Sequence, residues 1–345
     1  MGYYCGIDLG NKESVICVLD GRRQVMLDES VKTEAAAIKK VLKKYRGLTC
    51  VVEASPLAEW VSEVVETLGH KVTVVCPRKT KAILSAQSPR KKTDKRDARG
   101  LAELAKSGWY EAVHRKSAEA RELRSYMTAR KQLVQTQIAL SSSIRGILRA
   151  QGVKFDARGE EEDFVMQTRR IMKTQPPLVQ EAIVALLKAY ELTSTQSRAM
   201  YKKLQGTARD AEVTRLLMTM PSIGAATASA FVATIDDPAR FPDGERVAAY
   251  LGLTASVYQS GESEIRGRIT KTGDKMLRWY LVEAAHNLLT RSKISCELKA
   301  WGLRLKEKKG LGKARVAVAR RMAVILWSMW MYKQEFLPES LAAAA

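Results

Sequence analysis

The pattern of hydrophobic positions in the first hundred residues has two periods, which together predict a sheet with helices packed on it. Short apolar, β-branched runs alternate with stretches whose apolar residues recur every three or four positions. The order β-β-β-α-β-α-β, followed by a helix, indicates an α/β domain. Strands are expected at 3–9, 13–20, 23–27, 48–53 and 70–76, and helices at 33–46, 56–69 and 94–106.

Beyond this region the pattern keeps only the helical period. Residues 117–150 and 178–204 repeat a spacing of three to four, and between them lie an acidic link at 159–163 and the break Pro176-Pro177. These features predict a coiled-coil arm built as an α-hairpin. Such an arm either packs on its own domain or joins copies of the chain.

The C-terminal part is mostly helical, with one exception. A segment rich in Gly, Arg and hydroxyl side chains, 254–274, precedes a helix expected at 275–290 and predicts a β-hairpin. A basic loop is expected at 306–313, before the last helix. The changes of pattern indicate three domains: an α/β domain at 1–110, the arm at 111–208 and a mostly α domain at 209–335.

Charge narrows the choice of partner. The 345 residues include 58 Lys and Arg but only 37 Asp and Glu, which gives a net charge of +21. The excess is concentrated at 76–131 and 264–334, whose net charges are +10 and +12. A polyanion is needed to share such a charge, and nucleic acid is the default one.

Cysteines, histidines and hydropathy exclude several other classes. The five cysteines form no CxxC pair and the three histidines share no ligand motif, so a zinc site is not expected. No run of 18 apolar residues and no signal peptide is recognisable. We therefore expect a cytoplasmic protein with no membrane partner.

Four acidic residues are candidates for a metal site. Asp8 and Glu53 end two predicted strands that we expect to be neighbours, and Asp94 and Asp97 lie one turn apart on the following helix. Sites in open sheets form where neighbouring strands end. Converging carboxylates can hold Mg²⁺ or Mn²⁺ for phosphoryl transfer. The pattern resembles the acidic group of an RNase H-like, RuvC-type domain, and its alternative is a set of acids in ordinary turns.

Cationic side chains surround the start of this acidic helix. They suit contacts with the phosphates of a nucleic acid that the acids would act on. The alternative is a solvated helix start, whose charges pair with one another. The cations are Lys91, Lys92, Lys95, Arg96 and Arg99.

The segment Gly6-Ile7-Asp8-Leu9-Gly10 also fits the first phosphate loop of actin-like ATPases. That fold needs a second glycine-rich loop of the D-x-G-G type, which we do not find. A Walker A loop and a G-x-G-x-x-G fingerprint are absent as well. The ATPase interpretation therefore lacks half of its signature.

The hydroxyl-rich segment offers a candidate nucleophile. Ser260 precedes a glycine, whose missing side chain lets a phosphate approach closely. Arg266, Arg268 and Lys271 follow and are able to stabilise charge during transfer. Thr254 and Ser256 are competing hydroxyls. Ser256 is the main alternative, although it lies nearer to an apolar element and is expected to be used in local packing.

Seven short motifs, in this order, resemble those of the DEDD transposases of the IS110 and IS1111 insertion sequences, relatives of the Piv and MooV DNA invertases. The likeness extends over nearly the whole chain, although Ala255 stands where a proline is frequent in the family. Three motifs belong to the RuvC-like domain and four to the C-terminal transposase domain. They are Gly6-Ile7-Asp8, Val52-Glu53-Ala54-Ser55, Lys92-Thr93-Asp94-Lys95-Arg96-Asp97-Ala98, Pro221-Ser222-Ile223-Gly224, Tyr250-Leu251-Gly252-Leu253, Ser260-Gly261 and Gly267-Arg268-Ile269-Thr270-Lys271-Thr272-Gly273-Asp274.

The resemblance implies a specific activity and assembly. Such enzymes recombine donor and target DNA through a serine covalently joined to DNA, here Ser260, together with the DEDD metal site. A structured noncoding RNA guides them by pairing with both DNAs. They act as tetramers in which the RuvC-like domain of one subunit meets the serine of another. The implied location is the bacterial cytoplasm, in association with the nucleoid.

Two other functions remain open from the residues alone. A RuvC-like junction resolvase would cut DNA with metal-activated water, and it would need the four acids but not Ser260. A non-catalytic RNA-binding scaffold would need the basic surfaces but neither Asp8 nor Glu53.

Overall fold

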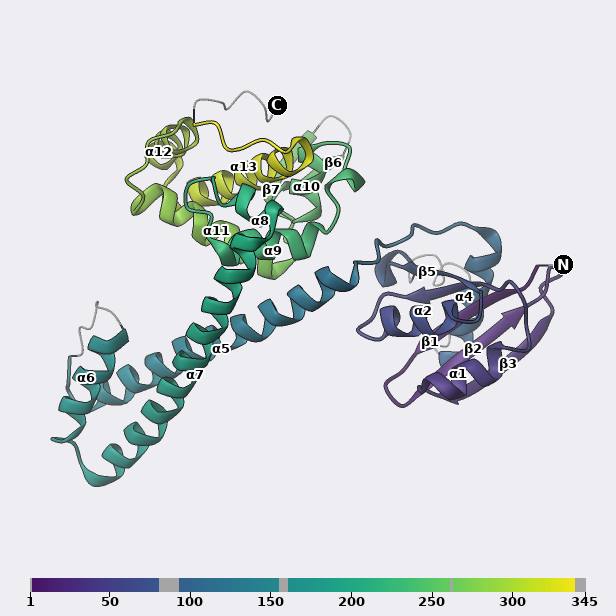
Figure 1. Cartoon of the computed structure of the whole chain (residues 1–345), viewed down its shortest axis with the longest axis horizontal. Coiled ribbons are helices and arrows are strands. Elements are labelled where there is room, and N and C mark those ends of the chain that lie inside the picture. The colour runs from purple at the N-terminus through teal and green to yellow at the C-terminus, as the bar shows by residue number, and fades with distance from the viewer. Residues whose placement is uncertain (1, 81–92, 155–160, 261–262, 339–345) are drawn as a thin grey trace. The chain divides into compact units, whose positions relative to one another are not determined.

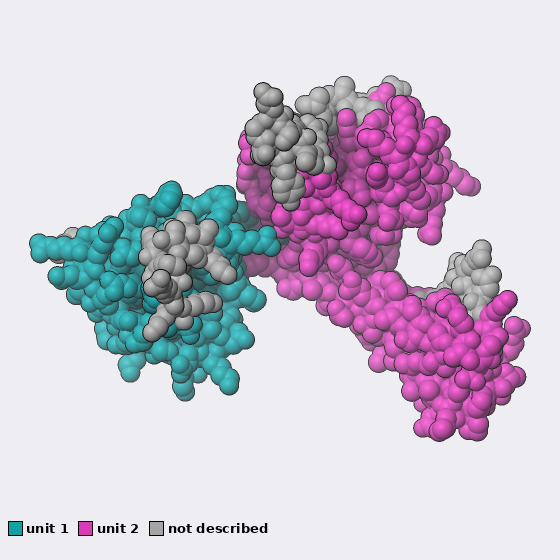
Figure 2. Space-filling model, turned by 180° about the vertical axis from the view of Figure 1, so that it is seen from behind, with its two compact units in different colours: residues 1–116 teal, residues 117–345 magenta. Residues whose placement is uncertain are grey.

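The computed structural model describes residues 2–80, 93–154, 161–260 and 263–338 (Figure 1). The chain forms two compact units, unit 1 at 1–116 and unit 2 at 117–345 (Figure 2). Each unit has its own hydrophobic core. The expected division of the second unit into an arm and a C-terminal domain stays a prediction.

Unit 1 is a mixed α/β fold built on a five-stranded sheet. Its strand order is β3-β2-β1-β4-β5; β2 is antiparallel to both β1 and β3, and β4 is parallel to β1 and β5. The strands are β1 (Tyr4–Leu9), β2 (Glu13–Leu19), β3 (Val25–Lys32), β4 (Thr49–Glu53) and β5 (Lys71–Val75), and the helices are α1 (Ala35–Leu42), α2 (Ala58–Glu66) and α4 (Asp94–Ser107).

The two faces of this sheet are covered by different helices. Cys5 and Ile7 of β1 belong to a core with α1 and α2, whereas Val51 of β4 packs with Leu101 and Leu104 of α4. Because side chains alternate along a strand, every second residue of β1 and β4 points toward α4. The middle residues of both strands are buried on both faces, with Gly6 and Val51 toward α4 and Ile7 and Val52 away from it, which explains why the strands read as hydrophobic runs.

Most elements of unit 1 lie where the sequence predicted them, with β3 as the main exception. The prediction ended at residue 27, whereas β3 continues to Lys32. Its second half, Asp28–Lys32, is largely exposed on an edge strand that pairs only with β2. Polar residues on such an edge hide the strand from a hydrophobicity pattern.

Unit 2 begins with two long helices, α5 (Ala118–Ala150) and α7 (Pro177–Asp210), which pack along each other as predicted. The sequence did not predict α6 (Glu161–Met172), which packs on α7. Its acidic start resembled a link, yet Phe164 and Thr168, one turn apart, are buried. The three helices share a small core of their own with Ile144, Leu148, Phe164, Ile183, Leu187 and Tyr190.

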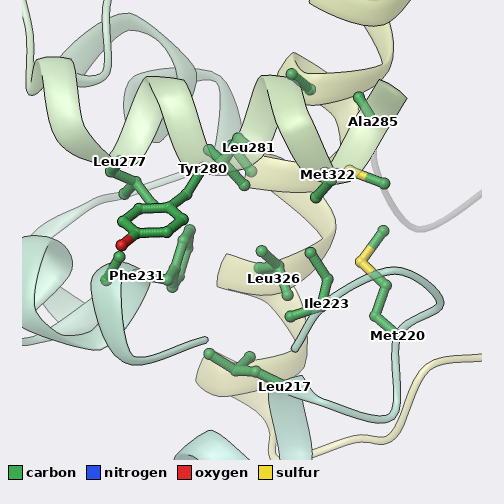
Figure 3. Packing of buried hydrophobic residues seen from close by; sticks show 14 of the residues in the cluster. Leu217, Met220, Ile223, Phe231, Leu277, Tyr280, Leu281, Ala285, Met322 and Leu326 are labelled. Atoms are coloured by element: carbon green, nitrogen blue, oxygen red, sulfur yellow. The ribbon is translucent and has the colours of Figure 1, made fainter. Parts of the chain in front are cut away.

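The larger core of unit 2 joins the first part of α5 and the last part of α7 to the C-terminal helices, through Met127 and Leu204. Phe231 of α9 packs in this core among side chains of α11 and α13 (Figure 3). The turn before α9 is a tight connection, because Ile223 is buried in this core and Gly224 caps the helix. The helices are α8 (Glu212–Leu217), α9 (Ala225–Ile235), α10 (Gly244–Tyr250), α11 (Lys275–Thr290), α12 (Glu297–Lys309) and α13 (Leu311–Tyr332).

The basic loop expected at 306–313 was wrong. The lysines Lys306, Lys308 and Lys309 form the last turn of α12, and α13 starts directly after Gly310. Cations in a last turn are favoured by the helix dipole, so a lysine cluster there does not signal a loop. Gly310 has a φ of +79°, which is the left-handed region where glycine carries no steric penalty.

No helix in the described ranges is long and apolar enough to span a membrane.

Candidate active site

The first pair of candidate acids ends two neighbouring strands of unit 1. β1 and β4 pair in parallel through Ile7 and Val52, so Asp8 and Glu53 follow side by side at one sheet edge. This confirms the predicted neighbour relation of the two strands. Since Gly6 and Val51 face α4, alternation puts Asp8 and Glu53 on that same face. Both acids are half-buried.

Gly6 explains how α4 comes so close to the sheet. A methyl group at this position would collide with the backbone of Ala98 and Ala102. These two alanines are fully buried and pack with Cys17 of β2. The glycine of the Gly6-Ile7-Asp8 motif is therefore needed because a helix backbone crosses the strand directly above it.

The direction of α4 brings its first turn toward the acids of the sheet. Lys106 in its last turn donates a hydrogen bond to the carbonyl of Gly21 at 2.8 Å, and Gly21 follows β2 at the sheet edge where β1 begins. Gly6 lies under the middle of the helix. The start of α4 therefore points to the end of the sheet where Asp8 lies.

The start of α4 carries the second pair of acids. Thr93 caps the helix by accepting a hydrogen bond from the amide of Arg96 at 3.4 Å. Asp94 and Asp97 occupy the first turn, where the helix dipole favours negative charge. Asp94 is exposed and Asp97 is half-buried.

The donor set suits a hard divalent cation, since it consists of carboxylates from three elements. In the parts of the chain that the structure describes, no three Asp, Glu, His or Cys side chains come close enough to hold a metal ion. Asp8 and Glu53 thus form one pair at the ends of β1 and β4, Asp94 and Asp97 form a second pair in the first turn of α4, and the convergence of the two pairs on a cation stays a prediction.

The expected phosphate-binding cations divide into two groups. Lys95, Arg96 and Arg99 are exposed on α4, whereas Lys91 and Lys92 lie outside the described residues. Arg99 is close enough to β2 to counteract part of the rise in the pKa of Cys17, which burial raises to about 11. Arg99 therefore belongs to the part of α4 that covers β2.

Two of the C-terminal motifs contact each other through glycines, Gly252 in one and Gly273 in the other. Gly252 has a φ of +65°, and a methyl group on it would come within 3 Å of the amides of Thr272 and Gly273. A methyl group on Gly273 would collide in turn with the carbonyl of Tyr250. The Leu-Gly-Leu and Thr-Gly-Asp motifs are thus two backbone segments in direct contact.

Charged side chains hold these two backbone segments in place through a hydrogen bond and an ion pair. The guanidinium of Arg278, a buried residue of α11, donates to the carbonyl of Leu251 at 2.8 Å, and burial lowers the pKa of Arg278. Asp274 caps α11 by accepting from the amide of Leu277 and also lies 2.5 Å from Arg124 of α5. Sequence analysis missed Arg124 and Arg278, because nothing in their local pattern separates them from solvated helix charges.

Lys131 lies two turns beyond Arg124 on α5. Its ammonium group is 5.5 Å from the ring centre of Trp279. Burial lowers the pKa of Lys131, the Asp274 carboxylate raises it, and Arg124 lowers it further. The start of α11 is therefore held by a mixed cluster of cations, one carboxylate and aromatic rings.

The hydroxyl-rich segment forms the expected β-hairpin, β6 (Ala255–Ser260) and β7 (Ser263–Ile269). The backbone of Ser260 pairs with that of Ser263 at the tip, whereas its side chain, Gly261 and the side chain of Arg266 lie outside the described residues. Ser256 at the root donates a hydrogen bond to the carbonyl of Arg268 at 3.1 Å. As expected, the Ser256 hydroxyl is engaged in local packing.

Arg268 and Lys271 lie at the root of the hairpin, where both line a hollow of about 990 Å³ between β7 and α13. Ile269 pairs with Ala255, and Lys271 follows beyond that pair, with its amide bonded to the carbonyl of Gly252. The backbone of Lys271 is thus separated from Ser260 by the length of the hairpin.

Comparison with known proteins identifies the class. A model described as "Transposase", for the DEDD transposases of IS110, matches residues 5–151, and a model described as "Transposase IS116/IS110/IS902 family" matches residues 214–299. Both describe transposases of insertion sequences, and together they cover about two thirds of the chain. The chain belongs to the IS110 family of transposases.

Several relatives are similar over most of their length. The "Transposase for insertion sequence element IS1111A" of Coxiella burnetii is 26% identical over 332 residues, 94% of this chain and 88% of that protein. The "Probable family 20 transposase" of Pseudomonas aeruginosa is 26% identical over 330 residues, 94% of this chain and 95% of that protein. The "Transposase for insertion sequence element IS1328" of Yersinia enterocolitica is 23% identical, over 81% of this chain and 83% of that protein.

Proposed function

We propose that this transposase recombines donor and target DNA through a phosphoserine bond at Ser260, with its metal site in an RNase H-like, RuvC-type unit 1. The observation that carries the proposal is the placement of two acid pairs on elements that pack against each other. Asp8 and Glu53 end adjacent parallel strands on the face covered by α4, whose first turn bears Asp94 and Asp97. The strand order β3-β2-β1-β4-β5 supports the RNase H-like assignment.

Asp8, Glu53, Asp94 and Asp97 would hold Mg²⁺ or Mn²⁺, which when bound supplies a Lewis acid for the reacting phosphate. The acids alternate with cations along the start of α4, and these cations are assigned to the phosphates on either side of the reacting one. We assign this role to Lys91, Lys92, Lys95, Arg96 and Arg99.

Ser260 acts as the nucleophile in this mechanism. Its hydroxyl oxygen attacks a DNA phosphorus, a serine–phosphorus bond forms, and the bond from phosphorus to the leaving deoxyribose oxygen breaks. The serine proton is released and the leaving oxygen takes up a proton. Attack by a hydroxyl of the other DNA on the phosphoserine reverses these steps and restores the serine. The engaged hydroxyl of Ser256 supports the choice of Ser260.

Guidance and assembly complete the proposal. The net charge of +21 supports binding of a structured noncoding guide RNA in addition to donor and target DNA. The chain acts as a homotetramer, in which the acids of one subunit serve the serine of another. The long helices α5 and α7 support self-association, because Ile138 and Leu192 are exposed apolar side chains on them.

The test is to trap the reaction on labelled DNA and to denature the protein. Wild type should retain labelled DNA, Ser256→Ala should retain it as well, and Ser260→Ala should lose it. An adduct lost in Ser256→Ala and kept in Ser260→Ala would move the nucleophile. Clean DNA cutting without any adduct would instead support a junction resolvase that uses water.

A second test addresses the guide. Protein purified from cells that carry the complete insertion sequence should retain one discrete RNA, which is released at high salt because many cationic contacts are lost. Random cellular transcripts in place of a discrete RNA would contradict guided recognition.

A further inference from the structure

The hollow at the hairpin root is lined by residues of α10, β6, β7, α12 and α13. Its lining includes Arg268 and Ile269 of β7, Trp301 of α12, and Lys313 and Val324 of α13. The lining is thus partly aliphatic and partly cationic, and it lies beside the hairpin that presents Ser260. At about 990 Å³ the hollow lies at the upper end of the range for ligand pockets.

The sequence of α13 builds this hollow through a second helix face. Its core face, which includes Val318 and Met322, is fully buried. The opposite face repeats every three to four residues, with Lys313, Ala317 and Arg320 directed into the hollow. Ala317 keeps the floor low, since a larger side chain at this position would extend into the hollow.

The root of the hairpin is held in place by a contact that leaves the hollow open. A methyl group on Gly267 would collide with the hydroxyl of Ser256, which donates to the carbonyl of Arg268. Gly267 is therefore small because the hydroxyl of Ser256 crosses beneath it. The bond ties β6 to β7 next to the hollow.

The charge of the hollow is strongly positive. Its lining has five cations, Arg268, Lys271, Lys313, Arg320 and Arg321, and one acid, Glu245. Glu245 forms an ion pair with Arg320. Within the described ranges, Arg268, Lys271 and Lys313 have no carboxylate partner. Three cations are thus left for an anionic ligand.

An aromatic platform accompanies these cations. The guanidinium of Arg321 lies 5.2 Å from the ring centre of Trp301. A guanidinium plane backed by an aromatic ring offers a flat, sequence-tolerant surface on which a nucleobase can stack. Phosphates on the cations and a base on this platform are the two requirements of an unpaired strand.

We propose that the hollow binds unpaired nucleotides of the DNA strand that is joined to Ser260. This inference rests on the function proposed above. From Ala255 at the root to Ser260 at the tip, β6 advances by five residues, roughly 16 Å at about 3.3 Å per residue. The hollow therefore holds the strand a few nucleotides away from the reacting phosphate and fixes its direction. Arg268 and Lys271 act on these neighbouring phosphates.

Binding of a fluorescein-labelled single-stranded 12-mer of thymidine to the full chain tests the proposal. Ala317→Trp fills the hollow without changing charge, and Lys313→Gln removes one lining cation. Lys308→Gln is the matched control, because Lys308 is exposed on α12 outside the hollow and its loss changes the net charge equally. We expect the two hollow variants to bind about tenfold more weakly than the control, the order of one stacked base or charged contact. Circular dichroism should show native helix content in all three.

A cross-link localises the strand directly. The same oligonucleotide with 5-iodouracil at each position in turn should, on irradiation, give a cross-linked peptide that contains Trp301. Loss of this cross-link in Ala317→Trp would support the proposal. Equal affinity of Lys313→Gln and Lys308→Gln, or a cross-link only outside the hollow, would overturn it. Displacement of the oligonucleotide by polyglutamate at equal charge concentration would show that the hollow binds anions in general, and would also overturn the proposal.

The adduct assay on Ser260, run in parallel, separates the two proposals. A normal adduct together with unchanged binding by Ala317→Trp would reject the hollow alone. Absence of the adduct in wild type, with the cross-link at Trp301 present, would reject the phosphoserine mechanism and with it the connection of the bound strand to Ser260.

Discussion

In both units a glycine allows two backbone segments to approach closely beside the candidate functional residues, but the segments differ: a strand and a helix in unit 1, two loops in unit 2. In unit 1, Gly6 lets the backbone of α4 cross a strand of a rigid sheet. In unit 2, Gly252 and Gly273 let two loop segments cross, and buried charges then hold the crossing. The comparison teaches that a sheet needs only a glycine to seat a helix, whereas crossing loops also need hydrogen-bond partners for their carbonyls.

The largest expected effect is on chemistry in unit 1. Asp8→Asn, Glu53→Gln, Asp94→Asn and Asp97→Asn keep side-chain size but remove the negative charge that would hold a cation. Each should reduce recombination in Mg²⁺ at least about 100-fold, the order of losing one catalytic electrostatic group. Strand-exchange assays on purified protein measure this, with thermal unfolding as the check on folding. Activity near wild type in three of the four would refute the metal site.

Replacing the glycine at the close backbone contact in each unit should destabilise both units. Gly6→Ala and Gly273→Ala each force a methyl group into backbone, so each should lower the free energy of unfolding by about 3 kcal/mol or more. Gly146→Ala in α5 is the matched control, since nothing lies within 4 Å of the added methyl group. It should stabilise the chain by about 0.5–1 kcal/mol through the better helix propensity of alanine. Urea unfolding of the three variants gives the values.

Arg278 tests whether the loop contact in unit 2 needs a hydrogen-bond donor in addition to its glycines. Arg278→Met keeps an aliphatic stem but removes the donor to the carbonyl of Leu251, which lies in a buried residue. The unsatisfied carbonyl should cost about 1–3 kcal/mol. Lys308→Met, on an exposed position of α12, should change stability little. Equal stabilities of the two variants would show that the contact between Gly252 and Gly273 is stable without the hydrogen bond from Arg278.

Sequence reasoning reached unit 1 more completely than unit 2, for physical reasons. Buried parallel strands give continuous apolar runs, and their ends place Asp8 and Glu53 by topology alone. The seating of α4 on Gly6 is not visible in the sequence, since a glycine before an acid also fits a phosphate loop. In unit 2, the partner of a carbonyl such as that of Leu251 is set by a contact 27 positions away in sequence, which no periodicity records.

The hollow in unit 2 shows a further limit of the pattern. Lys313, Ala317 and Arg320 repeat the helical spacing, which was a usable signal. This signal was obscured because the other face of α13 packs in the core. A helix that is apolar on one face is normally expected to expose its opposite face to water. Only the position of the hairpin turns that second face into a lining.

Cys17 gives the smallest effect on function and the finest test of how α4 is seated. Burial raises its pKa to about 11, and it packs with Ala98 and Ala102 of α4. The protonated thiol therefore contributes stability that is complete below the unfolded pKa near 9 and is lost as pH rises through about 11. At pH 8 the thiolate fraction is about 100-fold lower than in the unfolded chain, so alkylation should be correspondingly slow.

The same thiol then reports on the glycine beside it. Gly6→Ala displaces the backbone of α4, so Cys17 should be alkylated faster in that variant than in wild type. Cys5 faces α1 and α2 on the opposite side of the sheet, and a hydrogen bond with Cys50, together with burial, raises the pKa of Cys5 well above the usual range. Peptide mapping of iodoacetamide adducts separates the two thiols. Faster labelling of Cys17 alone would locate the damage at α4, whereas equal acceleration of both would show that the whole sheet has loosened.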